Sequence, residues 1–424
     1  MNMVILFGSL LLLILIGMPI GYAIGFSTWI TLITCSDIPL KLITQNAYAG
    51  VDSFPLMAIP FFILAGVLMT HGGIAKRLID FFNVFVGRIT GGLGMISIVT
   101  SLFFGAISGS AMATASAVGA FMIPEMKRAN YKDDFAGSLI ASAGTIGIII
   151  PPSIPFVIYG VVTGSSIGEL FVAGIVPGVL MAVALIIVCY IVSKKNGYGG
   201  TKQSDGIWDA FKRSIWALIS PIIVLGGIYG GIFTPTEAAV VSVFYSGFVG
   251  LVIYRELNLK NLYRALYETI VINGITTFMV GLSMGFASYL SLSQIPTKIA
   301  QGLIEITDNP FLLLVLINVF LLVVGCLVDN IPACIILAPI LLPVVTNLGM
   351  DPIQFGVILT FNLAIGFVTP PYGPNLFISA AVANIPVESM FKAIIPCIIA
   401  LIVVLAVITY IPAATMGTVM LMRG

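Results

Sequence analysis

The chain has 424 residues, of which 59% are hydrophobic and 8% are charged, and its formal net charge is +1. A soluble fold of this composition would expose more apolar surface than water tolerates, so a soluble globular protein is excluded. The small net charge gives no basis for binding nucleic acid. We therefore expect an all-α, multi-pass membrane protein.

The N-terminal apolar run from Met3 to Thr34 has no basic leading segment and no obvious small-residue cleavage site. It therefore predicts a retained membrane segment rather than a signal peptide. Pro19 is expected to break this run into two short helices. Further on, 72–92 places apolar residues at helical spacing beside lysines and arginines, which predicts a helix at the cytoplasmic interface or a simple amphipathic linker.

The next apolar segment, Leu93 to Pro124, is interrupted by the sequence SGSAMATAS, in which Ser108, Gly109, Ser110, Thr114 and Ser116 cluster. The interruption leaves two arms that we expect to be too short to cross a membrane. This pattern predicts a re-entrant hairpin.

The hairpin is followed by GIIIPPSIP, Gly147 to Pro155. Its prolines lack amide donors, which frees carbonyls and ends one half-helix against the start of another. Freed carbonyls suit Na⁺, whereas hydroxyls and half-helix N-termini favour an anion. Gly147 is thus a candidate cation ligand, and Thr145 and Ser153 are candidate substrate ligands. An ordinary proline kink is the alternative.

The second half of the chain repeats these features. Pro343 follows Pro124 by 219 residues, and four more pairs of prolines share that spacing: Pro151 and Pro370, Pro152 and Pro371, Pro155 and Pro374, Pro177 and Pro396. We infer two repeats, 1–200 and 201–424. In a membrane chain, paired interrupted helices indicate a transport site at the repeat interface.

The second hairpin, Phe311 to Pro343, is interrupted at VDNIPA, which contains Asp329 and Asn330. A carboxylate within an apolar run is costly unless it is paired, lines a wet cavity or binds a cation. Asp329 is therefore either a cation ligand or a cap of the following helix.

The second broken helix is GFVTPPYGP. Gly366 and Thr369 in this motif are candidate cation ligands. Asn362 before it and Asn375 after it are candidate substrate ligands. We expect about ten crossings and two hairpins, with a transport domain built from about 93–165 and 311–385 and a scaffold from the remaining helices.

Basic residues predict the topology, because lysine and arginine collect in cytoplasmic loops. The loop from Lys127 to Asp134 carries three basic residues, whereas the equivalent loop from Thr346 to Ile353 carries none. The two loops are therefore expected on opposite sides of the membrane, which makes the repeats inverted.

Other residues suggest no further chemistry. The five cysteines lie scattered in apolar surroundings, which favours core positions over a disulfide framework. Glu237 is expected to cap a helix after a proline turn. The chain has no HExxH and no phosphate-binding loop, so we predict neither an enzyme nor an ATP-driven pump.

Taken together, several motifs resemble the large membrane subunit of tripartite ATP-independent periplasmic (TRAP) transporters. The resemblance covers nearly the whole length and rests on FPLMAIPFFILAG, SGSAMATASAVG, GIIIPPSIP, GIFTPTEAA and GFVTPPYGP. It implies an elevator-type secondary transporter in the bacterial inner membrane, driven by Na⁺ and needing no other cofactor. Its implied substrates are organic acids such as sialic acid, which overall resemblance slightly favours, or a C4-dicarboxylate.

The resemblance also implies partners: a small four-helix membrane subunit, a periplasmic substrate-binding protein and membrane lipid. Because the chain begins directly with the large subunit, we expect the small one to be separate. The residues that match the family's cation-site regions are Ser108, Gly109, Ser110, Gly147, Asp329, Asn330, Gly366 and Thr369. Rival interpretations are a stand-alone Na⁺/carboxylate symporter, a channel and an intramembrane enzyme.

Overall fold

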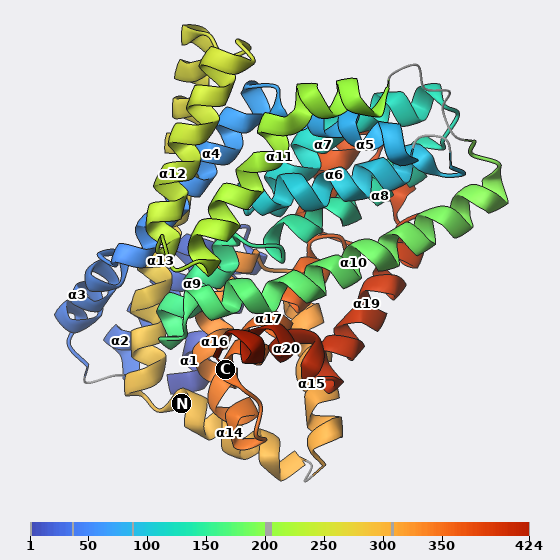
Figure 1. The fold of residues 1–424 in the computed structure, drawn as a ribbon. Coiled ribbons are helices and arrows are strands. Elements are labelled where there is room, and N and C mark those ends of the chain that lie inside the picture. The colour runs from blue at the N-terminus through green and yellow to red at the C-terminus, as the bar shows by residue number, and fades with distance from the viewer. Residues whose placement is uncertain (1, 36–37, 87–88, 200–205, 307–308, 424) are drawn as a thin grey trace.

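The computed structural model describes residues 2–35, 38–86, 89–199, 206–306 and 309–423. Within these ranges every regular element is a helix (Figure 1). The predicted boundary between the repeats, at 200 and 201, and the basic residue Arg88 lie outside the described residues.

The first half of the chain forms ten α-helices and two short 3₁₀ turns within the described residues. Their bounds are α1 Asn2–Leu15, α2 Ile20–Cys35, α3 Leu40–Val51, η1 Phe54–Met57, α4 Ala58–His71, α5 Ile74–Val86, α6 Gly92–Ser108, α7 Ala111–Arg128, α8 Asp133–Gly144, η2 Thr145–Ile148, α9 Ile154–Thr163 and α10 Ile167–Asn196.

The second half continues with α11 Ile207–Tyr229, α12 Pro235–Phe248, the π-helical η3 Val249–Ile253, α13 Leu259–Leu292, α14 Ile295–Ile306, α15 Pro310–Gly325, α16 Asn330–Asn347, α17 Pro352–Gly366, α18 Pro374–Ala383, η4 Val387–Met390, α19 Ile395–Tyr410 and α20 Ala413–Arg423. Both ends of α16 follow those of α7 by 219 residues.

Local chemistry places several of these helix ends where the sequence predicts them. The N-terminal run breaks before Pro19, since α1 ends at Leu15 and α2 starts at Ile20. At the start of α12, the Glu237 carboxylate accepts a hydrogen bond from Thr234 N at 2.8 Å, and Thr234 Oγ1 accepts one from Glu237 N at 3.3 Å. This reciprocal capping box confirms the structural role expected of Glu237.

The hairpin arms are longer than the sequence predicts. Pro124 and Pro343 lie inside α7 and α16 rather than at their ends, and each helix has 18 residues. At 1.5 Å per residue such an arm reaches about 27 Å, close to the roughly 30 Å apolar core of a bilayer. The expectation of an arm too short to cross is therefore wrong for α16, whereas α7, of equal length, is not among the helices apolar enough to cross alone. A proline removes one helix hydrogen bond, but neighbouring helices can support the freed carbonyl.

Six described helices are long and apolar enough to cross a membrane alone: Phe54–His71, Ile167–Asn196, Ile207–Tyr229, Pro235–Ile253, Leu259–Leu292 and Asn330–Asn347. The pair α19 and α20, bent by 48°, adds a seventh if it is one span. Seven further apolar helices have 10–17 residues. The chain is thus a multi-pass membrane protein.

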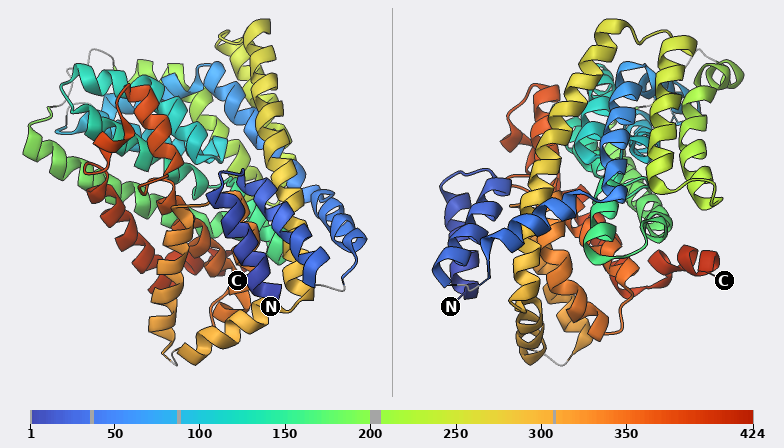
Figure 2. Two further views of the ribbon diagram at one scale, coloured as in Figure 1. Left: turned by 180° about the vertical axis from the view of Figure 1, so that it is seen from behind. Right: turned by 90° about the vertical axis from the view of Figure 1, so that its left-hand side faces the viewer.

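The helices pack in two groups. In the first, α13 contacts α2, α3 and α4, while α12 lies along α4 and α11. In the second, α6, α7 and α8 pack together, α15 and α16 pack on α17, and α10 packs on α6, α17, α19 and α20. Figure 1 shows α10 running diagonally across the molecule, and Figure 2 shows α13 beside the N-terminal helices. The two groups meet where α13 contacts α16 and where α6 contacts α4 and α11, and α5 packs on both α6 and α11.

Within the second group, the two halves exchange helices. The helix after the first break, α9, packs on α16 and α17, and the helix after the second break, α18, packs on α7 and α8. The hydroxyl of Tyr159 in α9 donates to the carbonyl of Pro352 at 2.7 Å. Asn375 Nδ2 in α18 donates to the carbonyl of Ala141 at 3.0 Å. Each half therefore completes the packing of the other.

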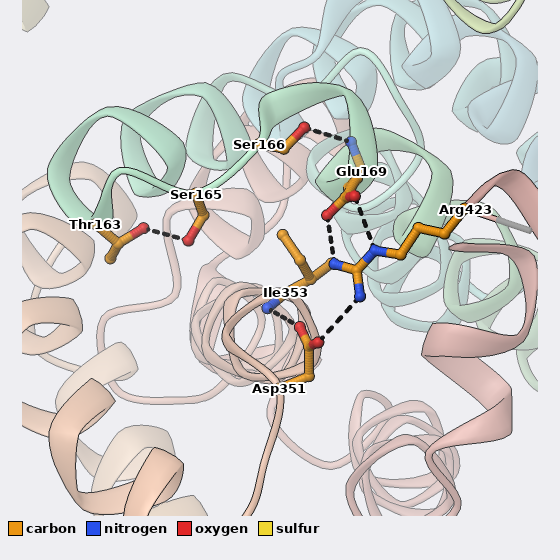
Figure 3. A network of polar contacts seen from close by, with 7 residues as sticks. All are labelled: Thr163, Ser165, Ser166, Glu169, Asp351, Ile353 and Arg423. Atoms are coloured by element: carbon orange, nitrogen blue, oxygen red, sulfur yellow. Dashed lines mark hydrogen bonds and ion pairs between the residues drawn. The ribbon is translucent and has the colours of Figure 1, made fainter. Parts of the chain in front are cut away.

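An ion-pair network joins the last helix to this group (Figure 3). Arg423 lies 2.6 Å from Glu169 Oε2 in the first turn of α10 and 3.4 Å from Asp351 Oδ2, which caps α17. These side chains are partly exposed, so we expect each pair to contribute little stability. Arg423 therefore lies beside the loop that contains Asp351.

Candidate functional site

The two hairpin tips meet at a cavity of about 240 Å³. Four of the predicted cation-site residues line it: Gly109, Ser110, Asp329 and Asn330. The broken helices contribute to the same wall, and α13 closes the cavity from the other group of helices. The remaining lining residues are Ala111, Met112, Ile148, Ile154, Pro155, Ile272, Ile275, Thr276, Met279, Ile331 and Phe367.

The first tip needs glycine at its turn. Gly109 ends α6 with a φ of +60°, and a Cβ atom there would lie 2.8 Å from the carbonyl oxygen of Pro152. The carbonyl of Gly109 also accepts a hydrogen bond from Ile154 N at 3.3 Å. Glycine adopts this left-handed conformation without steric cost, so the tip can rest directly on the first break.

Oxygen atoms gather behind this tip. Ser108 Oγ lies 2.9 Å from Thr114 Oγ1, which in turn donates to the carbonyl of Ser110 at 2.8 Å. A Cβ atom on Gly147 would lie 2.5 Å from Thr114 Oγ1 and 2.9 Å from Ser110 O. The structure thus brings Ser108, Ser110 and Gly147 together, and it adds Thr114, which belongs to the same polar cluster but was not among the predicted cation ligands.

Asp329 occupies the second tip and caps α16. Its Oδ1 accepts a hydrogen bond from Asn330 N at 2.6 Å, which confirms the capping interpretation. Its side chain also lines the cavity, and it forms no ion pair with any residue that the structure describes. A carboxylate in an apolar surrounding without a basic partner favours a bound cation, so capping and cation binding are compatible roles.

Asn330 next to it is 2% exposed, and neither its Oδ1 nor its Nδ2 has a hydrogen-bond partner among the described residues. Leaving such a buried group without a partner costs about 1–3 kcal/mol. Because Asn330 lines the cavity, a ligand or water held there would remove this cost. Of the predicted site residues, Asn330 therefore points most directly to a ligand.

The second break rests on the second hairpin. A Cβ atom on Gly366 would lie 2.2 Å from the carbonyl carbon and oxygen of Gly325 at the end of α15. Three residues on, Thr369 Oγ1 donates to the carbonyl of Ile365 at 2.7 Å. Gly366 therefore packs against the second hairpin, Thr369 bonds within its own half-helix, and neither lines the cavity.

The four predicted substrate residues are all buried and lie outside the cavity lining. Ser153 caps α9, and its hydroxyl donates to Ile148 O at 2.6 Å, while Thr145 Oγ1 donates to Ser142 O at 2.6 Å. Asn375 binds Ala141 as described above. Asn362 Nδ2 donates to Asn318 Oδ1 at 2.7 Å, within a network that sequence reasoning missed.

The contribution of α13 was also missed. Ile272, Ile275, Thr276 and Met279 form the wall that faces the hairpin tips. A faint signal is present, because Asn273, Thr276 and Thr277 interrupt an otherwise apolar span. Within the described ranges, no three His, Cys, Asp or Glu side chains group as metal ligands, so a cation site here would need hydroxyl and carbonyl oxygens besides Asp329.

Comparison with known proteins identifies the family. The sequence profile described as "Tripartite ATP-independent periplasmic transporter, DctM component" matches residues 7–414. The chain belongs to this family. As a DctM-family protein it is a large permease of a TRAP transporter, which confirms the resemblance seen in the motifs.

Relatives of this DctM-family chain are named for different substrates. It is 41% identical to the isethionate TRAP transporter permease protein DctMQ of Oleidesulfovibrio alaskensis, over 97% of the chain and 65% of that protein's length. It is 39% identical to the sialic acid TRAP transporter large permease SiaM of Vibrio cholerae, over 95% of both chains. It is 40% identical to the C4-dicarboxylate large permease DctM of Pseudomonas aeruginosa, over 93% of both chains.

Among solved structures, the DctM-family chain resembles the YdaH transporter of Alcanivorax borkumensis, described as having an unusual topology. The TM-score is 0.64 at 13% identity, over 87% of this chain and 88% of that one. At this identity the likeness concerns the fold alone.

Proposed function

We propose that this large permease couples the uptake of an organic acid to the inward movement of Na⁺. The observation that carries the proposal is the cavity where the two hairpin tips meet, with the Asp329 carboxylate and the unpartnered Asn330 amide in its wall. The cluster of Ser108, Ser110 and Thr114 oxygens beside the first tip supplies hard donors of the kind that Na⁺ prefers.

An anionic substrate suits the same cavity. Ile154 and Pro155 line it at the start of α9, and the N-terminus of a half-helix carries partial positive charge. The relatives are named for isethionate, sialic acid and C4-dicarboxylates, which are all organic acids. We therefore propose an organic acid substrate, with sialic acid and C4-dicarboxylates as the first compounds to test.

We further propose that the permease works with a small membrane subunit and a periplasmic substrate-binding protein in the bacterial inner membrane. Support comes from the names of the relatives, which are permeases of TRAP transporters. These names disfavour the alternative of a stand-alone Na⁺/carboxylate symporter. Uptake that needs no binding protein would favour that alternative again.

For the mechanism, we propose inverted repeats and an elevator-type movement. Two observations support them: α7 and α16 share one spacing, and α9 and α18 pack reciprocally on the other half. The helices predicted to form the transport domain, 93–165 and 311–385, belong to the group that carries the hairpins. Packing of α10 and α19 on this group favours including them in the moving part.

Transport is expected to require a Na⁺ gradient. In proteoliposomes that contain the permease and its small subunit, with binding protein supplied outside, an inward Na⁺ gradient should drive accumulation of sialic acid, succinate or isethionate. Replacing that gradient with an equal K⁺ gradient should abolish accumulation, because the proposed site is built for a small, hard cation. Uptake at an unchanged rate in K⁺ would refute Na⁺ coupling, and omission of binding protein is the matched control.

The loop after α7 and the loop after α16 are expected to face opposite sides of the membrane. Arg128 and Asn347 are both exposed at these ends, so single cysteines placed there should react with an impermeant thiol reagent. On a background without the five native cysteines, Arg128→Cys should label only from the cytoplasmic side and Asn347→Cys only from the periplasmic side. Labelling of both from one side would exclude inverted repeats.

A further inference from the structure

A second cavity, of about 370 Å³, lies between α5, α11 and the turn after η3. We call it the α5–α11 cleft. None of its lining residues lines the candidate transport cavity. Its charged lining residues are Lys76, Arg77, Asp80, Lys212, Arg213 and Glu256, which leaves an excess of two positive charges.

Several contacts connect the residues that line the cleft. The Arg77 guanidinium lies 2.6 Å from Glu256 Oε1 and 3.7 Å from the centre of the Tyr254 ring. The Tyr254 hydroxyl donates to Arg213 O at 3.2 Å and accepts a hydrogen bond from Ala217 N at 3.1 Å. These contacts join the turn after η3 to both helices, so the cleft has a fixed shape.

Two lysines at the rim are available to an anion. Lys76 and Lys212 are exposed and form no ion pair with any described residue. The nearest interaction of Lys212 is with the Trp208 ring, whose centre lies 5.6 Å from Nζ. The acidic side chains of the cleft therefore do not neutralise these two ammonium groups directly.

The cleft lies where apolar helices end. The span that includes α4 ends at His71 just before α5, and the span that includes α12 ends at Ile253 just before Tyr254. On α11, the charged residues Lys212 and Arg213 precede an apolar stretch. Figure 1 shows α5 and α11 side by side near one edge of the molecule. These transitions from apolar to charged sequence are typical of the level of lipid headgroups.

Two exposed tryptophans flank Lys212 on α11. Trp208 is 65% exposed and Trp216 is 40% exposed, and Trp216 lines the cleft. Exposed tryptophans gather at the boundary between the apolar core and the headgroups, where a ring can contact acyl chains and its N–H can meet water. A ligand in the cleft would thus have charged groups on one side and an apolar surface on the other.

We propose that the α5–α11 cleft binds the phosphate headgroup of an anionic phospholipid, with Lys76 and Lys212 contacting the phosphate. A free phosphate ion shares this charge, but the exposed tryptophan rings beside the lysines favour a ligand that also has acyl chains. Occupancy would link α11 to α5, the helix that leads into the first hairpin. The proposal requires only that the chain lies in a membrane, and it is independent of Na⁺ coupling.

The three tryptophans of the chain, Trp29, Trp208 and Trp216, allow a direct test. In the Trp29→Phe variant, all tryptophan fluorescence comes from the two residues beside the cleft. The full chain is reconstituted in vesicles that contain either phosphatidylglycerol or phosphatidylcholine brominated on the acyl chains, since bromine quenches nearby tryptophan. Quenching should show a preference for phosphatidylglycerol of about fivefold for each lysine that contacts it. The Trp208→Phe/Trp216→Phe variant, which keeps only Trp29, should show no such preference.

Charge variants locate the site. Lys76→Gln/Lys212→Gln should remove the preference for phosphatidylglycerol, whereas Lys195→Gln/Lys260→Gln, which removes two exposed lysines outside the cleft, should keep it. High salt should also weaken the preference in the wild-type cleft, which tests the proposal without substitution. Equal quenching by the two lipids, or a preference that survives Lys76→Gln/Lys212→Gln, would overturn it. Displacement by millimolar inorganic phosphate would instead assign the cleft to a soluble anion.

Discussion

Gly366→Ala is expected to abolish uptake and to lower the free energy of unfolding by about 3 kcal/mol or more. A methyl group there would lie 2.2 Å from the carbonyl of Gly325, closer than real Cβ atoms approach other heavy atoms. Because the obstacle is backbone rather than a flexible side chain, the second hairpin must move away from the second break. That movement would also displace Asp329 at the hairpin tip.

Gly247→Ala is the matched control, because no atom lies within 4 Å of a Cβ built at that glycine of α12. There the added methyl should leave uptake unchanged, and the higher helix propensity of alanine should slightly raise stability. Thermal unfolding of the purified chain and uptake in proteoliposomes measure both effects. A Gly366→Ala variant with wild-type uptake and stability would mean that the two backbones do not pack as described.

Asp329→Asn is expected to raise the Na⁺ concentration needed for half-maximal uptake by about ten- to a hundredfold. An interaction with a charged group contributes about 1.5–3 kcal/mol, and each 1.4 kcal/mol corresponds to a factor of ten. Asparagine caps helices about as well as aspartate, so the fold and the cap of α16 should persist. The measurement is the dependence of initial uptake rate on Na⁺ concentration.

Asp351→Asn is the control for Asp329→Asn, since Asp351 also caps a helix, α17, but lies outside the transport cavity. It should leave the Na⁺ dependence unchanged. If Asp329→Asn instead behaves like the control, Asp329 acts only as a cap, and any cation site must be built from hydroxyl and carbonyl oxygens.

The sequence predicts the breaks well because they depend on local chemistry. Proline at 151, 152, 370 and 371 removes amide donors wherever it occurs, and Gly109 permits a turn that other residues resist. The same reasoning failed at Pro124 and Pro343, which lie inside continuous helices. Whether a proline ends a helix depends on what surrounds it, and that is set by tertiary packing.

The residues that line the site were harder to predict, because tertiary packing also decides which side chains face the cavity. Asn362, four residues before the second break, was a predicted substrate residue. In the fold it faces α15 and α19, where Asn318 bridges it to Thr409. A sequence shows that a polar residue lies in an apolar helix, but it does not show which neighbour that face of the helix meets. Thr276 on α13 was overlooked because the sequence does not show that α13, which packs with α2, α3 and α4, also faces the hairpin tips.

The exchange of helices between the halves has a consequence for synthesis. The hydroxyl of Tyr159 and its acceptor, the carbonyl of Pro352, are 193 residues apart in sequence. At a translation rate of about 5–20 residues per second, the first half waits about 10–40 s in the membrane before its partner emerges. Assembly of the hairpins and broken helices is therefore post-insertional, and an exposed, half-built intermediate is a required stage in the biogenesis of this chain.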